Sequence, residues 1–257
     1  MIMDFETKKK NGLYTIVTYL IVFNIVSLLI SAIVLEILKS LNMNLMIKEN
    51  ENLASSILNL IVYIILIIGI GYFNWHEVKT DVKEFVKDKG NIIFKVLASY
   101  GIFLAINLFI SSMITNIEFY YNLTSDILGN TPINTTSNNQ IIIEDILHSK
   151  AFWMMFLSAG ILGPICEEVV FRKAFFNICK TKEMGILLSS LCFGLIHITS
   201  SINQYDPLSL ILMAIPYITS GIAFGIIYIK NDCNITVSTI VHMLSNIISM
   251  LGIIFLS

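Results

Sequence analysis

The 257-residue chain is 56% hydrophobic and 13% charged, with a formal net charge of −2 and a mean hydropathy of +0.79. This composition excludes a disordered chain and disfavours an ordinary soluble domain, because several apolar runs reach the roughly 20 residues that span a bilayer. The charge balance provides no basic surface, so we expect no nucleic-acid partner.

Apolar runs along the chain predict an all-α fold, a polytopic membrane helical bundle with about seven transmembrane helices. The first run is too long for a signal-peptide core and has no clear small-residue cleavage site, so we interpret it as a retained span. The expected spans are Leu13–Ile37, Leu53–Phe73, Ile92–Ile117, Ala151–Ile178, Met184–Ile198, Pro207–Ile229 and Ile235–Leu256.

Two connecting segments differ in character. Asn74–Asn91 is charged and predicts a short surface helix, whereas Glu118–Ser149 is rich in Asn, Thr and Ser and predicts an outside loop. Lysines gather before the first span and in Asn74–Asn91, Lys89 among them, and such loops face the cytoplasm. We therefore expect an integral protein with a cytoplasmic N-terminus and an outside C-terminus. The Ile-, Asn- and Lys-rich composition suggests a bacterial cell membrane.

The fourth expected span carries three ionisable residues between apolar flanks, in the stretch GPICEEVVFR that ends at Arg172. An ionisable side chain inside a membrane is costly and indicates a functional site by default. On an α-helix, Glu168 and Arg172 share a face, whereas Glu167 is rotated by about 100°. We expect Glu168 and Arg172 to form a supporting ion pair and Glu167 to act as a general base or acid. The simpler interpretation is an ion pair at the cytoplasmic end of the helix, with Glu167 facing water.

Two later spans each add a polar face. Phe193 and His197 lie four residues apart, as do His242 and Asn246. Taken singly, each pair has a simpler explanation, a satisfied buried histidine or a hydrogen bond between helices. Three such faces on three spans favour one polar site among the last four spans, because charges facing lipid are rarely tolerated.

The three patterns E-E-x-x-x-R, F-x-x-x-H and H-x-x-x-N, in this order on successive late spans, resemble the CPBP family of intramembrane proteases. This family includes the type II CAAX prenyl proteases and the bacterial "Abi" proteins. The resemblance covers 151–257, which we interpret as a catalytic core of four spans; residues 1–150, with three spans and their loops, match nothing beyond hydrophobicity. The matching residues are Glu167, Glu168, Arg172, Phe193, His197, His242 and Asn246.

The resemblance implies an intramembrane endopeptidase. Glu167 and His197 would activate a water molecule, and His242 and Asn246 would stabilise the oxyanion. Glu168, Arg172 and Phe193 would support the site. Lys173 departs from the family, which commonly has Gly at this position, and we expect it to change local packing rather than chemistry.

The same residues admit a zinc site with Glu167, His197 and His242 as ligands. The chain has no H-E-x-x-H helix, and Asn246 suits an oxyanion better than zinc, so we expect a metal-free mechanism with no cofactor. The sequence is also compatible with a non-catalytic bacteriocin-immunity or binding protein of the same fold, and with a proton-coupled transporter. The expected partners are membrane lipid and a peptide or protein substrate, such as a leader peptide, pheromone or bacteriocin precursor.

Overall fold

The computed structural model describes residues 4–87, 91–128 and 131–256, and all regular structure in these ranges is helical. Seven helical segments in them are long and apolar enough to cross a membrane. The expected all-α bundle with about seven transmembrane helices is therefore confirmed, and the chain is an integral membrane protein. The spanning segments are Phe5–Ser40, Lys48–Lys87, Ile92–Ser125, Phe152–Ile178, Lys182–Ser201, Pro207–Lys230 and Ile235–Leu256.

Several spans contain more than one helical type. The first comprises α1 (Phe5–Ile21), a π-helical turn η1 (Val22–Val26) and α2 (Ser27–Ser40). The fourth comprises α6 (Phe152–Leu157), π-helical η2 (Ser158–Leu162), α7 (Gly163–Glu168), π-helical η3 (Val169–Ala174) and α8 (Phe175–Ile178). The others are α3 (Lys48–Lys87), α4 (Ile92–Leu128), α9 (Lys182–Ile198) with the 3-10 turn η4 (Thr199–Ser201), α10 (Pro207–Lys230) and α11 (Ile235–Leu256).

Both connecting segments differ from expectation. The charged segment 74–87 is not a separate surface helix but the continuation of α3, which ends at Lys87; Lys89 lies outside the described residues. The segment Glu118–Ser149 is not an irregular loop, because α4 continues to Leu128 and residues 138–147 form α5 (Asn138–Leu147). Ser137 caps α5 by accepting a hydrogen bond from the backbone N–H of Gln140.

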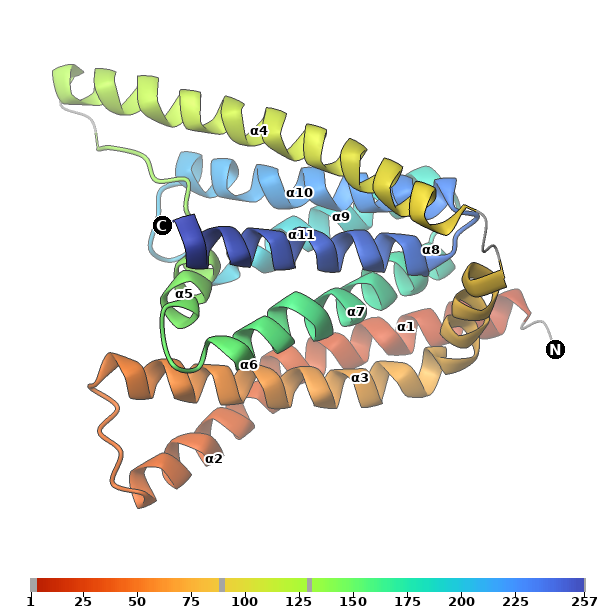
Figure 1. Ribbon diagram of the computed structural model, residues 1–257, viewed down its shortest axis with the longest axis horizontal. Coiled ribbons are helices and arrows are strands. Elements are labelled where there is room, and N and C mark those ends of the chain that lie inside the picture. Colours follow the sequence, from red (N-terminus) through yellow and green to blue (C-terminus); the bar gives the residue numbers. More distant parts are fainter. Residues whose placement is uncertain (1–3, 88–90, 129–130, 257) are drawn as a thin grey trace.

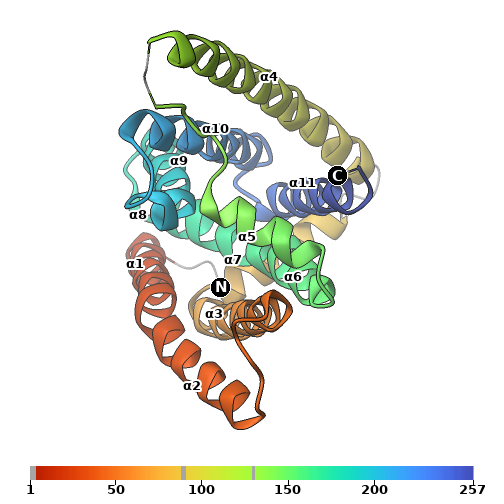
Figure 2. The same cartoon turned by 90° about the vertical axis from the view of Figure 1, so that its left-hand side faces the viewer.

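The fourth span lies at the centre of the bundle. It has α1 and α3 on one side and α9, α10 and α11 on the other, as the end-on view shows (Figure 2). In its most apolar stretch 61% of the residues are buried, against 11% for the first and third spans. Charged residues on the fourth span are therefore enclosed by protein, whereas the outer helices mainly face lipid.

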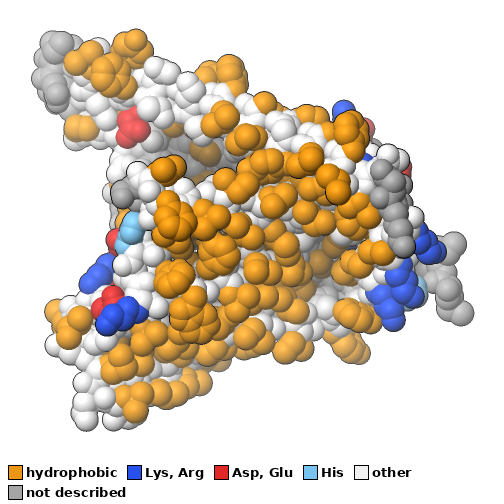
Figure 3. All heavy atoms as spheres, in the orientation of Figure 1, with side chains coloured by type: hydrophobic (Ala, Val, Ile, Leu, Met, Phe, Trp, Pro, Cys, Tyr) orange, Lys and Arg blue, Asp and Glu red, His pale blue; other side chains and the backbone are white. Residues whose placement is uncertain are grey.

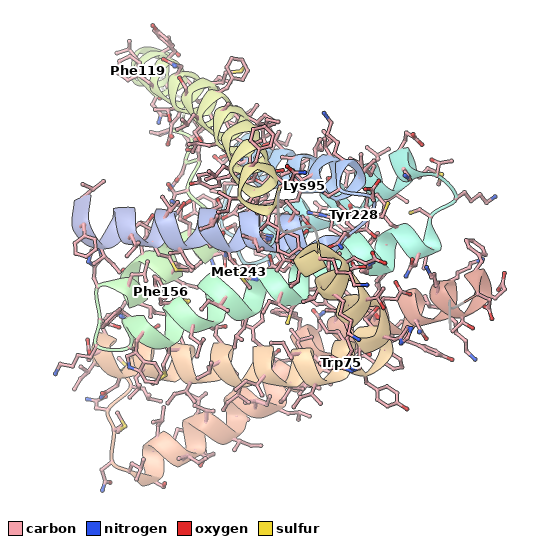
Figure 4. The ribbon with its side chains drawn as sticks, turned by 45° about the vertical axis from the view of Figure 1, so that its right-hand side comes forward. Trp75, Lys95, Phe119, Phe156, Tyr228 and Met243 are labelled. Atoms are coloured by element: carbon pink, nitrogen blue, oxygen red, sulfur yellow. The ribbon has the colours of Figure 1, made fainter. Side chains whose placement is uncertain are left out.

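The outermost helix, α4, diverges from its neighbours toward one end of the bundle (Figure 1). Near that end Phe119 points away from the other helices and is 61% exposed (Figure 4). On the face shown in Figure 3, hydrophobic side chains cover the middle and charged side chains gather at the two ends. The N- and C-termini lie at opposite ends of the bundle, as an odd number of crossings requires (Figure 1).

Close packing of α9 on α10 depends on small residues. A Cβ atom on Gly221 would lie 2.9 Å from the Cα atom of Ser190, so only glycine allows the two backbones this approach. Gly225 faces Ile186 one turn further along. The G-x-x-x-G face thus packs within one chain and fixes α9, which carries Phe193 and His197, against α10.

Candidate active site

The stretch with the two glutamates is a short α-helical segment between two π-helical turns. Ser158–Leu162 precede it and Val169–Ala174 follow it. Sequence spacing assumes a uniform 3.6-residue period and does not reveal such turns, which often occur at functional sites. The resulting α7 directs both carboxylates inward: Glu167 is 7% exposed and Glu168 is fully buried.

Glu168 and Arg172 lie together, as their spacing predicts. The Nε atom of Arg172 is 3.3 Å from Oε2 of Glu168, and neither side chain is exposed. The guanidinium also lies between two rings, with its Cζ atom 5.9 Å from the centre of Phe193 and 5.8 Å from that of Phe224. The ion pair and the contact of the guanidinium with two aromatic rings both offset part of the cost of burying these charges.

Glu167 has a partner from another helix. The Nε2 atom of His242, on α11, lies 3.6 Å from Oε2 of Glu167, and its Nδ1 atom lies 3.2 Å from Oε1 of Glu168. The ring of His242 stacks on Phe224, with centroids 4.3 Å apart and planes at 22°. Thus one imidazole bridges the two carboxylates, a contact that the sequence did not predict.

The two carboxylates of α7 have different neighbours. Glu168 lies against the guanidinium of Arg172, whereas the carboxylate of Glu167 faces the imidazole of His242. A buried carboxylate beside an imidazole is an arrangement suited to proton transfer.

His197 has a hydrogen-bond partner on its own helix. Its Nδ1 atom lies 2.7 Å from the carbonyl oxygen of Phe193, one turn earlier on α9. Because a carbonyl can only accept, Nδ1 carries the hydrogen and Nε2 keeps its lone pair. The ring stacks on Tyr217 of α10 at 4.4 Å, and the Tyr217 hydroxyl is 2.9 Å from Oγ of Ser137, the residue that caps α5. Two contacts therefore fix the orientation of His197.

Phe193 links the two histidines. Its ring centre is 4.4 Å from that of His197 and 5.9 Å from that of His242. The structure therefore brings Glu167, Glu168 and Arg172 together with both predicted histidines around one buried aromatic ring.

Asn246 lies on the same helix as His242 but contacts a different part of the fourth span. Its side-chain N–H donates to the carbonyl oxygen of Ala159 at 2.9 Å. This carbonyl has lost its usual backbone donors, because the N–H of Gly163 bonds to Ser158 and Pro164 has no N–H. Asn246 thus satisfies a carbonyl that the π-turn and the proline leave free, and this bond attaches α11 to η2.

Lys173 is buried and paired rather than merely altering local packing. Its Nζ atom lies 2.7 Å from Oδ2 of Asp81 and 3.2 Å from the carbonyl oxygen of Cys233. Asp81, on the extension of α3, also accepts the N–H of Ile235 at the start of α11. The lysine therefore joins the fourth span, α3 and the first turn of the helix that carries His242.

The proposed zinc ligands do not fit a metal ion well. Among the residues that the structure describes, no three His, Cys, Asp or Glu side chains are grouped closely enough to hold one. Both ring nitrogens of His242 face carboxylates, and one nitrogen of His197 is bonded to a backbone carbonyl. These donors are therefore oriented toward protein partners rather than toward a common metal position.

Sequence reasoning missed two residues that shape the site, Tyr217 and Phe224. Both are aromatic residues in an apolar span, and nothing in their spacing separates them from lipid-facing neighbours. Only the packing of α10 against α9 and α11 shows that they stack on His197 and His242.

Comparison with known proteins identifies the part of the chain that contains these residues. Residues 149–248 match the family model described as type II CAAX prenyl endopeptidase Rce1-like. This segment is similar to the Rce1-like family. The resemblance to CPBP proteases is thereby confirmed, and the Rce1-like segment includes the three motifs.

Relatives match over longer or shorter parts of the chain. An uncharacterised protein of Mycoplasma capricolum is 25% identical over 80% of the chain and 58% of its own length. The protein named "Putative membrane peptidase YdiL" of Bacillus subtilis is 30% identical over 57% of the chain and 51% of its own length. UPF0177 protein YbdI of Lactococcus lactis is 36% identical over 23% of the chain and 34% of its own length. The chain thus spans only a third to somewhat over half of these relatives, and no solved structure matches it.

Proposed function

We propose that the protein is an intramembrane endopeptidase that hydrolyses a peptide bond of a membrane-associated protein or peptide. The observation that carries the proposal is the buried contact of Glu167 with His242, beside a second carboxylate that Arg172 already balances. A purely structural ion pair needs one carboxylate for one guanidinium. The additional carboxylate, in contact with an imidazole, is suited to proton transfer. The match to a peptidase family supports the same reaction class.

In this mechanism Glu167 removes a proton from a water molecule, and the water oxygen attacks the carbonyl carbon of the scissile bond. The tetrahedral intermediate then collapses, the C–N bond breaks, and the proton on Glu167 passes to the leaving amine. One water molecule is consumed and the carboxylate is restored. His197, with its Nε2 lone pair free, accepts a hydrogen bond from the attacking water.

The oxyanion needs hydrogen-bond donors. We assign this role to His242 and Asn246, as the family resemblance implies. One N–H of the Asn246 amide is already bonded to Ala159, so the second N–H is the one available to the oxyanion. His242 in its protonated form supplies Nε2–H.

For orientation, we propose a cytoplasmic N-terminus, an outside C-terminus and a bacterial cell membrane. The lysines that precede the first span, Lys8, Lys9 and Lys10, support this assignment. The test fuses alkaline phosphatase or green fluorescent protein to the C-terminus. Active phosphatase with a dark fluorescent fusion is expected, and the reverse result would place the C-terminus in the cytoplasm.

The decisive experiment uses purified protein in liposomes and two internally quenched probes. One probe is a peptide with an apolar segment of about 20 residues, the length of a membrane span, and the other ends in a farnesylated CaaX tail. We expect the wild type to cleave at least one probe and Glu167→Gln to cleave neither. The matched control is Glu183→Gln, on the exposed first turn of α9, which should behave as wild type.

Two outcomes would overturn the proposal: full activity of Glu167→Gln, or no cleavage of either probe by the wild type. In the second case a bacteriocin-resistance phenotype that survives Glu167→Gln would favour a non-catalytic immunity protein. If cleavage is observed, a small secreted-peptide gene beside this one would favour a leader peptide, pheromone or bacteriocin precursor as substrate.

A further inference from the structure

Besides His242, a second polar group lies close to the helical turn that carries Glu167. It is the hydroxyl of Tyr63, which comes from α3, the second span. A Cβ atom on Gly163 would lie 3.2 Å from the Tyr63 Oη atom and 3.3 Å from its Cζ atom, so the tip of the phenol rests on the backbone at Gly163. Any larger residue than glycine would press against the phenol.

Helix geometry connects this contact to the catalytic carboxylate. Gly163 and Glu167 are four residues apart on α7 and share a face. Helical side chains lean toward the N-terminus, so the carboxylate of Glu167 extends over the turn that begins at Gly163. The Tyr63 hydroxyl, which rests against Gly163, therefore lies on the side of α7 toward which that carboxylate extends. Glycine at position 163 thus provides the space in which a phenol from another span meets Glu167.

Packing holds Tyr63 in this position. The Sγ atom of Cys166, next to Glu167, is 4.0 Å from the backbone carbonyl oxygen of Tyr63. Phe23 meets the Tyr63 ring edge-on at 5.9 Å and also lies 4.7 Å from the ring of Tyr19. Tyr19 in turn contacts Phe171, at 5.8 Å. A row of aromatic rings from the first two spans thus covers the fourth span beside the site.

We infer that Tyr63 is a positioning residue of the active site, whose hydroxyl donates a hydrogen bond to Glu167 and orients its carboxylate toward His242 and the reacting water. The inference rests on the proposed function and assigns a role to the first two spans, which the family model does not cover. One carboxylate oxygen of Glu167 faces Nε2 of His242. A hydrogen bond from the Tyr63 hydroxyl would hold the carboxylate at a second point and so prevent its rotation.

The titratable groups around Glu167 come from all the elements packed against it. They are Tyr19 on α1, Tyr63 on α3, Cys166 and Glu168 on α7, Arg172 on η3, His197 on α9, Tyr217 on α10 and His242 on α11. Of these, Tyr63 is the one whose hydroxyl rests against Gly163, and this hydroxyl can be removed while the ring and its packing against Phe23 are kept.

The test compares Tyr63→Phe with Tyr72→Phe, a matched control on the same helix whose side chain is 83% exposed. Cleavage of the liposome probes should show kcat lowered roughly 10- to 100-fold for Tyr63→Phe with little change in KM, as loss of a hydrogen bond to a charged group predicts. The acid limb of the pH profile of kcat/KM should move to higher pH, because a donor to the ionised carboxylate is gone. Tyr72→Phe should match the wild type in both.

A second measurement separates the hydrogen bond from any effect on folding. Replacement of Tyr63 by 3-fluorotyrosine keeps the ring and makes the hydroxyl a stronger donor, so the acid limb should move to lower pH. Wild-type kcat and pH profile in both variants would overturn the inference. In that case an inactive Glu167→Gln would leave the proposed function intact, whereas an active Glu167→Gln would overturn the proposed function itself.

Discussion

The Nδ1 atom of His242 lies 3.2 Å from Oε1 of Glu168, so the last helix of the bundle is bonded to the buried ion pair of the fourth span. Because the carboxylate accepts, Nδ1 carries a hydrogen and Nε2 is directed at Glu167, 3.6 Å away. Glu168 therefore has two functions: it balances Arg172, and it fixes the orientation of the imidazole that serves Glu167.

Glu168→Gln tests whether these two functions, rather than packing alone, require Glu168. Glutamine keeps the shape of the glutamate side chain and removes its negative charge. Arg172 would be left buried without a counter-charge, and we expect the free energy of unfolding to fall by about 3–5 kcal/mol. Cleavage should be lost in the fraction that stays folded, since a neutral amide accepts the Nδ1–H of His242 more weakly than a carboxylate does and no longer fixes the orientation of the ring. Thermal unfolding in detergent and the liposome assay measure the two effects.

The matched comparison is the double variant Glu168→Gln with Arg172→Gln, which buries no unpaired charge. Part of the lost stability should return, but cleavage should not. Restored cleavage would show that Glu168 serves only to balance Arg172.

Lys173→Met tests the link between the fourth span, α3 and α11. Its removal leaves Asp81, 2.7 Å from Nζ in the wild type, buried without its partner, and we expect a loss of about 3–5 kcal/mol of stability. Turnover per folded molecule should be retained, because Lys173 contacts none of the residues around Glu167 that carry the chemistry. Lys182→Met, at the exposed start of α9, is the control and should change neither quantity. A large fall in kcat with unchanged stability would place Lys173 in the site itself.

The sequence predicts those features that depend on local periodicity. Continuous apolar runs predict the seven spans, and a four-residue spacing predicts that Glu168 meets Arg172, as their 3.3 Å contact shows. It does not predict the π-helical turns, because a uniform period is assumed. It also missed the extension of α4 to Leu128, since polar Asn and Thr residues there resemble a loop.

Contacts between spans are beyond what spacing can predict. Which histidine lies against Glu167 depends on the rotational orientation of α9 and α11 about their own axes. In the structure His242 is 3.6 Å from Glu167, and His197 bonds to the carbonyl oxygen of Phe193. The same applies to Asn246, whose bond to Ala159 follows from a carbonyl that only a π-turn before Pro164 leaves free. The assignment of the chain to two parts, 1–150 and 151–257, stays a prediction.

Removal of metal should leave activity unchanged. The expectation follows from His242, both of whose ring nitrogens face carboxylates, so that it has no free nitrogen for a shared ion. We expect full cleavage after dialysis against EDTA and 1,10-phenanthroline, and elemental analysis should find less than stoichiometric zinc. Activity that disappears on chelation and returns with added zinc would favour a zinc-dependent protease, with Glu167, His197 and His242 as ligands.

Asn246 could hold α11 in place, take part in catalysis, or do both. The two roles can be separated by giving the carbonyl of Ala159 a backbone N–H donor in place of the Asn246 side chain. Asn246→Leu leaves the buried carbonyl of Ala159 without a partner, and we expect a loss of about 1–3 kcal/mol of stability. In a Pro164→Ala background, residue 164 regains an N–H that can reach this carbonyl through a π-type bond, so Asn246→Leu should cost much less. If Asn246 also stabilises the oxyanion, the double variant should regain stability but keep a kcat lowered about 10²- to 10³-fold. Recovery of both stability and kcat would show that Asn246 acts only by holding α11 against η2.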